Sequence, residues 1–243
     1  MNLAQLRSKG LIGSVNVEPA TDAEFPYGLG TQGLHEVVDE AFGDRAAATG
    51  FVFTATKPIR QEALFWISQA STRRNLGCLS EAALQEMTRR QICRISLTTR
   101  NSRDALWAAE EAVISGTVSH VIAEVDEADF TATRRLTLAS GRHGVPITLL
   151  LPYGNKGATA AATRWRVTTR PSSPNSYDAR APGCARWSAS LERCRIAPSA
   201  AGRTFDIEWN DETLSIRVVS RMVAGPLEAR ASELEKFQRR KTA

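Results

Sequence analysis

Lysine is scarce in this chain of 243 residues: five of its 31 basic residues are lysine, and the other 26 are arginine. The pattern G-x-x-x-x-G-K-[ST], in which a lysine supplies charge to the phosphates of a nucleotide, does not occur. So large an excess of arginine indicates a coding bias, which makes an arginine by itself weak support for a binding site. The sequence therefore excludes nucleotide binding by an ordinary phosphate loop.

Cysteine and histidine are also few. The four cysteines form no C-x-x-C pair, and the three histidines are scattered along the chain. A structural zinc site requires such ligands at short, paired spacings. We therefore expect reduced, mainly structural thiols and no metal site.

Long apolar runs are missing as well. No stretch approaches the roughly 18 residues that suggest a membrane-spanning helix, and the opening MNLAQLRSKGLIGSV lacks the apolar centre of a secretory signal. Hydrophobic residues make up 42% and charged residues 23% of the chain, as in soluble globular proteins. We expect a cytoplasmic protein that does not enter a membrane.

A glycine-rich run, GLGTQG over residues 28–33, matches the G-x-G-x-x-G pattern of dinucleotide-binding folds. That pattern binds phosphate where it follows a strand and opens a helix. Here it follows a loop that contains Pro26 and precedes LHEVV, which is typical of a strand. We interpret the run as a turn that leads into the first strand of the core.

Strands and helices alternate over the first 151 residues. Apolar strands are predicted at 34–38, 63–68, 92–98, 120–126 and 145–151. Helices are predicted at 39–53, 80–89, 102–116 and 129–144. Ser102 is the expected N-cap of the third helix, and Gly116 is its expected end. This order predicts an α/β fold with a mainly parallel sheet and helices on both faces.

After Pro152 the pattern changes to an alternation of apolar and polar residues, which is typical of antiparallel strands that extend the sheet. These strands are predicted at 163–169, 185–194, 205–209 and 214–220, with a loop at 171–183. We divide the chain into a lead-in over 1–24, a core over 25–220 and a C-terminal tail over 221–243.

The segment VVDEAFGDRAAAT, between the first strand and its helix, has the position of a phosphate loop. It contains no lysine and carries the acids Asp39, Glu40 and Asp44, whose charge repels a polyanionic phosphate. Glu124 and Asp126 end a later strand, where a carboxylate holds Mg²⁺ in nucleotide hydrolases, but here they lack the lysine and hydroxyl partners. We interpret them as an acidic turn, and we expect a degenerate nucleotide site without ATP binding or catalysis.

Positive charge is concentrated late in the chain. Residues 164–203 contain eight basic and two acidic residues, a net charge of +6. Within them Trp165 lies between Arg164 and Arg166, a combination that could stack on a base and contact phosphate. The alternative is a strand with Trp165 in the core and both arginines outward. The first interpretation predicts a patch that contacts single-stranded DNA, and both stay open at this point.

Four blocks in order, GLGTQGLHEVVDEAF, DALWAAEEAVISGTVSHVIAEV, RRLTLASGRHGVPITLLL and TRWRV, resemble the ImuA family of bacterial inducible-mutagenesis proteins. The resemblance covers roughly residues 28–220, and the family pattern is lost between residues 67 and 91. It implies a RecA-like core whose Walker motif has been lost, with no cofactor.

The resemblance also implies a function. It suggests a non-enzymatic accessory factor in SOS-induced translesion synthesis that acts with the RecA recombinase, with ImuB and with an error-prone replicative-type polymerase. Two alternatives stay open: a cell-division inhibitor like SulA, and a RecA-family ATPase with an unorthodox phosphate loop. Filamentation without mutagenesis would favour the first alternative, and measurable ATP binding the second.

The C-terminal tail, PLEARASELEKFQRRKTA from Pro226 onward, predicts a short amphipathic helix. A lone helix of this length is marginal in water, so we predict that it docks into a groove of RecA or ImuB. A helix packed on its own core and a disordered end are the alternatives. In this prediction Leu234 and Phe237 are the apolar anchors. Arg239, Arg240 and Lys241 contact an acidic rim of the partner's groove. The predicted partner-binding residues are Leu227, Leu234, Phe237, Arg239, Arg240 and Lys241.

Overall fold

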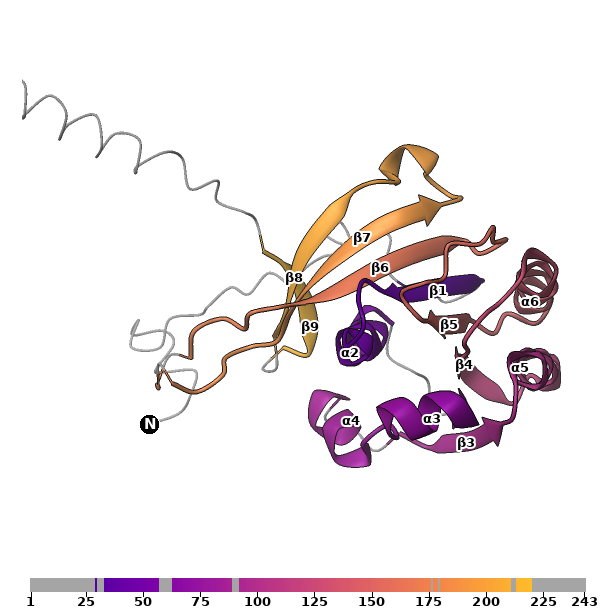
Figure 1. Cartoon of the computed structure of the whole chain (residues 1–243), viewed down its shortest axis with the longest axis horizontal. Coiled ribbons are helices and arrows are strands. Elements are labelled where there is room, and N and C mark those ends of the chain that lie inside the picture. The colour runs from indigo at the N-terminus through magenta and orange to yellow at the C-terminus, as the bar shows by residue number, and fades with distance from the viewer. Residues whose placement is uncertain are drawn as a thin grey trace, which may run out of the picture.

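The computed structural model describes residues 29, 33–56, 63–88, 92–175, 177–178, 180–210 and 213–219. Within these residues a nine-stranded sheet has the order β3-β2-β4-β5-β1-β6-β7-β8-β9 (Figure 1). The predicted lead-in over 1–24 and tail over 221–243 lie outside the described residues, so the division into these parts stays a prediction.

The sheet has a parallel part and an antiparallel part, as the sequence pattern predicts. The strands are β1 (Leu34–Asp39), β2 (Ala63–Gln69), β3 (Arg94–Thr99), β4 (Val118–Glu124), β5 (Ile147–Leu151), β6 (Thr163–Arg170), β7 (Arg186–Cys194), β8 (Thr204–Asn210) and β9 (Ser215–Val218). The helices are α2 (Arg45–Ala55), α3 (Ala70–Leu76), α4 (Glu81–Thr88), α5 (Ser102–Ser115), α6 (Phe130–His143) and the short 3₁₀ helix η1 (Pro198–Ala200). Among the described residues, no helix is both long and apolar enough to span a bilayer.

The position of β6 corrects one prediction. We expected residues 163–169 to belong to the antiparallel extension, but β6 pairs in parallel with β1 and antiparallel with β7. Alternation of apolar and polar residues shows which side chains share a face, but it does not show the direction of the neighbouring strand. β6 is therefore the strand at which the parallel and antiparallel parts of the sheet join.

Two apolar layers cover the sheet. Helix α2 and the segment that contains α3 and α4 lie on one face, and α5 and α6 lie on the other (Figure 1). The layer under α2 includes Val37, Phe51, Trp66, Trp165 and Trp187. The layer under α5 and α6 includes Leu34, Val38, Ile67, Val121 and Leu149. Because β1 contributes to both layers, it is buried along its whole length.

One boundary of α5 differs from the sequence-based expectation, and one short helix was not expected. The N-cap of α5 is Asn101 and not Ser102, since the Asn101 side chain accepts a hydrogen bond of 2.8 Å from the Asp104 N–H. The predicted end of α5 at Gly116 is confirmed by its left-handed backbone, with φ of 64°. Helix α3 was not predicted at all, because only Thr72 of its seven residues is buried and no apolar stripe marks it.

Helix α2 approaches the sheet closely at Gly50. A Cβ atom at this position would lie 2.8 Å from Cζ2 of Trp187, which belongs to the core. We expect Gly50→Ala to lower the free energy of unfolding by about 1–3 kcal/mol, because the added methyl group overpacks the core. Urea denaturation followed by tryptophan fluorescence measures this change.

Gly141 in α6 is the matched control. A Cβ atom there would meet nothing within 4 Å, so Gly141→Ala should raise the free energy of unfolding by about 0.5–1 kcal/mol through helix propensity alone. If Gly50→Ala stabilised the protein as much as Gly141→Ala, close packing of α2 on β7 would not be the constraint at Gly50.

Candidate functional site

The loop between β1 and α2 lies at the carboxyl edge of the parallel strands, where ligands bind in open α/β sheets. β1 runs through Asp39 and α2 begins at Arg45, so the predicted helix over 39–53 starts six residues late. At the other end of β1, Gly33 has a φ of 97° and leads directly into the strand. The GLGTQG run therefore meets the amino end of a strand, as a turn does, although four of its six residues are outside the described part.

A buried ion pair fills the base of the loop. The Nε and Nη2 atoms of Arg45 both lie 3.0 Å from Oδ2 of Asp39, and both side chains are about nine-tenths buried. Burial raises the pKa of Asp39; the Arg45 guanidinium opposes this, and the charges of Asp44 and Glu124 add to it. The strand end that a nucleotide phosphate would approach thus already contains a carboxylate and its own cation.

Asp44 holds the loop in shape. Its Oδ1 accepts a hydrogen bond of 3.0 Å from the Thr169 N–H, and its Oδ2 accepts one of 3.2 Å from the Ala41 N–H. Burial acts to raise the pKa of Asp44, but hydrogen bonds from Thr169, Thr168 and Ala41 outweigh it, so the pKa lies below its usual value. Asp44 therefore stays charged and tied to β6, where it opposes an incoming anion.

Glu124 faces the same region from the end of β4. Its Oε2 accepts a hydrogen bond of 2.5 Å from the Ser68 hydroxyl and one of 3.1 Å from Nε1 of Trp66. Asp126, just beyond the strand, accepts hydrogen bonds from Ser71 and Thr72 at the start of α3. These contacts tie β4 to β2 and α3, so the two acids have structural partners, as an acidic turn after a strand would.

A metal centre has no donor set within the described ranges. No three histidine, cysteine, aspartate or glutamate side chains come together there in a way that could hold a metal ion. The four cysteines are free thiols, and Cys194 alone among them is buried.

The predicted Arg–Trp–Arg surface is wrong. Trp165 has an exposed fraction of 0% and packs against Phe51 and Phe205, with ring centroids 5.5 and 5.9 Å away, so it cannot stack on a base. The alternative places Trp165 correctly in the core, but it is wrong for Arg164, which is buried and donates from Nε to Oε2 of Glu36 at 2.6 Å. Arg166 pairs with Glu192 at 2.5 Å.

Two arginines of the basic segment pair with the acidic strand beside it. Arg186 lies 2.5 Å from Glu208, and Arg170 lies 3.8 Å from Asp206. Both acids belong to β8, which follows the basic segment in the sequence and pairs with β7. The net charge of +6 over residues 164–203 is a property of the linear sequence and does not by itself form a surface patch.

Sequence reasoning missed the residue that completes the loop. Arg45 directly follows Asp44 and is the first residue of α2. The phosphate-loop pattern requires a lysine, so it does not identify this arginine. A carboxylate at the strand end with an arginine six residues later was the available signal. The predicted partner-binding residues of the tail, Leu227 to Lys241, lie outside the described residues, and their role stays a prediction.

Comparison with known proteins agrees with the blocks noted in the sequence. No protein-family model matches the chain. The proteins called Protein ImuA in two strains of Caulobacter vibrioides are each 30% identical to it over 194 residues. The match covers 73% of this chain and 77% of each relative. The chain belongs to the ImuA family.

Proposed function

We propose that this protein is a non-enzymatic accessory factor in SOS-induced mutagenesis by translesion synthesis. In this proposal it recruits or bridges the RecA recombinase, ImuB and an error-prone replicative-type polymerase in the cytoplasm. Membership of the ImuA family supports a role in the mutagenesis system.

The observation that carries the proposal is the Asp39–Arg45 ion pair in the loop after β1. In a RecA-like core the loop after the first strand is where backbone N–H groups and a lysine hold nucleotide phosphates. The strand order and the mainly parallel sheet are consistent with such a core. A loop that contains three acids and a self-paired arginine supports a scaffold that has kept the fold and lost nucleotide binding.

We expect the purified protein to show no binding of ATP and Mg²⁺ in the micromolar range at the loop after β1, as measured by titration calorimetry. Asp39, Glu40 and Asp44 repel the phosphates, and Arg45 is already bound to Asp39 at 3.0 Å. The RecA recombinase, titrated in the same buffer, is the positive control. Binding in the micromolar range would contradict the proposal and favour an ATPase with an unorthodox loop.

The tail is tested separately by truncation after Gly225. Within the described residues, the apolar layer under α2 extends to Val218 and the other layer to Ala161, so truncation after Gly225 removes neither. We therefore expect the truncated protein to unfold at the same urea concentration as the full chain. We expect it to lose damage-induced mutagenesis and capture of RecA or ImuB, because the predicted anchors Leu234 and Phe237 are removed. A truncated protein that captures both partners at full strength would place the docking surface on the core.

A further inference from the structure

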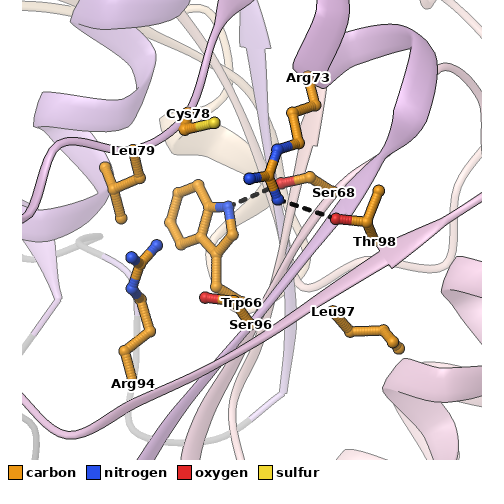
Figure 2. Close-up of a pocket in the computed structure, with 9 residues that line it drawn as sticks. All are labelled: Trp66, Ser68, Arg73, Cys78, Leu79, Arg94, Ser96, Leu97 and Thr98. Atoms are coloured by element: carbon orange, nitrogen blue, oxygen red, sulfur yellow. Dashed lines mark hydrogen bonds between the residues drawn. The ribbon is translucent and has the colours of Figure 1, made fainter.

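A cavity of about 230 Å³ lies between the edge of the sheet and the connection from α3 to α4, away from the loop after β1. Trp66 and Ser68 of β2 form its floor together with Arg94, Ser96 and Thr98 of β3, and Arg73 of α3 lies over it (Figure 2). Four of the residues that line the cavity, Ser68, Arg73, Cys78 and Leu79, lie within residues 67–91, where the family pattern is lost in the sequence.

The register of the two edge strands builds the floor of the cavity. β2 and β3 pair in parallel with Leu64 opposite Arg94, Trp66 opposite Ser96 and Ser68 opposite Thr98. Because alternate residues of a strand share a face, the three polar residues of β3 line up beside Trp66 and Ser68. The floor is firm, since Trp66 is buried and stacks on Phe53 of α2 with ring centroids 5.7 Å apart.

The side chains around the cavity present hydrogen-bond donors. Nη1 of Arg73 donates to the Thr98 hydroxyl at 3.1 Å, which leaves the proton of that hydroxyl to be donated elsewhere. Among the described residues no carboxylate lies within ion-pair distance of Arg73. Arg94 contacts Glu81, but its buried Nε has no partner in the described part. Two guanidinium groups and the hydroxyl groups of β3 therefore surround one space (Figure 2).

We propose that this cavity binds a phosphate group, either free or carried by a nucleotide or a nucleic-acid backbone. Arginine forks match the oxygens of phosphate in pairs, and hydroxyl groups supply further donors. The volume of about 230 Å³ is smaller than the roughly 300–1,000 Å³ of pockets that enclose drug-sized ligands, so it fits a phosphate with only a small part of its carrier. This site is independent of the proposed role in mutagenesis.

The neighbouring acids do not block an anion. The side chain of Glu81 is 63% exposed, so an entering phosphate can replace it on Arg94 at little cost, as expected for an ion pair at the surface. Glu124 lies opposite Ser68 on β4, on the same face of the sheet, and it does not line the cavity. It is buried, and its Oε2 accepts hydrogen bonds from Ser68 and Trp66, which partly compensate its charge.

Titration of the full chain with inorganic phosphate, at an ionic strength held constant with chloride, tests the proposal. We expect saturable binding that becomes at least tenfold weaker in Arg73→Gln and in Arg94→Gln. Arg74→Gln is the matched control, because Arg74 is the next residue of α3 and does not line the cavity, and it should bind as the parent does. Absence of saturable binding in the parent, or full binding in the Arg73→Gln/Arg94→Gln double variant, would overturn the proposal.

Titrations with thymidine monophosphate and with a short single-stranded oligonucleotide identify the source of the phosphate. Equal affinity for phosphate and the monophosphate supports a free or nucleotide phosphate. Binding of the oligonucleotide at least tenfold tighter than phosphate, with the same loss in both variants, supports a nucleic-acid backbone.

Cys78 provides a second measurement that does not depend on folding of the variants. Cys78 lines the cavity and is exposed, whereas Cys93 is exposed but does not line it. Saturating phosphate should slow alkylation of Cys78 by iodoacetamide at least threefold and leave the rate at Cys93 unchanged, as measured by mass spectrometry. Equal rates at Cys78 with and without phosphate would count against the site.

Discussion

Replacing Arg164 by methionine is expected to lower the free energy of unfolding by about 3–5 kcal/mol, as measured by urea denaturation. Arg164 donates to Glu36 at 2.6 Å, and the Glu36 side chain has no exposed area, so the substitution leaves a buried carboxylate without its cation. Nη1 of Arg164 also donates to the Gly157 carbonyl at 2.7 Å, which ties the loop between β5 and β6 to the sheet. We therefore expect this loop to become more sensitive to proteolysis.

Two further variants separate the cost of an unpaired buried carboxylate from the cost of replacing any arginine in this strand. Glu36→Gln combined with Arg164→Met should recover part of the loss, because the uncompensated charge is removed. Arg170→Met, six residues along the same strand, should cost less than about 1 kcal/mol, since the Arg170–Asp206 pair is 3.8 Å apart and half of Arg170 is exposed. Equal losses for Arg164→Met and Arg170→Met would show that burial of the pair does not decide the effect.

Acidification from pH 6.5 to pH 4.5 is expected to remove about 2 kcal/mol of stability through His120 alone, because the loss per pH unit rises toward about 1.4 kcal/mol as the pH falls below 6.5. Burial, with a smaller effect of the neighbouring His35, lowers the pKa of His120 from 6.5 to about 3. Between these values the unfolded chain binds a proton that the folded protein does not. The contribution is therefore complete well above pH 6.5, and it is lost progressively as the pH falls from there toward 3.

His120→Gln isolates this contribution. Nε2 of His120 lies 2.9 Å from the Thr148 hydroxyl, and glutamine offers a polar group at a similar reach without a titrating ring. The difference in unfolding free energy between pH 6.5 and pH 4.5 should shrink in His120→Gln and stay unchanged in His143→Gln, where the histidine is exposed at the end of α6. An unchanged difference in both variants would mean that His120 does not set the pH dependence.

Most of the fold follows from local patterns in the sequence. The apolar runs of β1, β2, β4 and β5 are too continuous for surface strands, and the glycines after α5 and α6 end these helices as expected. Helix α3 escaped detection because it packs through a single buried threonine. The direction of β6 could not be predicted, since it depends on its pairing with β1, whose sequence lies far away.

The candidate site shows a similar limit. The acids of the loop after β1 were visible in the sequence, because charge can be counted from residue types. The pairing of Arg45 with Asp39, and of Arg164 with Glu36, depends on which groups burial brings together. The same residue type, arginine, is a core ion-pair partner at position 164 and a neighbour of the surface cavity at position 73. Counting arginines in the sequence cannot separate these roles.

The place of β1 in the middle of the sheet affects how the chain folds during synthesis. Among the strands of the described residues, β1 is the first to emerge from the ribosome. Its partners are β5 and β6, and the contact between His35 and Thr163 closes a loop of 128 residues. Contacts of such long range form slowly, because the entropy of loop closure is lost before they stabilise the chain. Both edges of this apolar strand stay unpaired until β5 has been synthesised, and one edge stays unpaired until β6 is complete at residue 170. We expect such a nascent chain to be prone to aggregation and to bind chaperones.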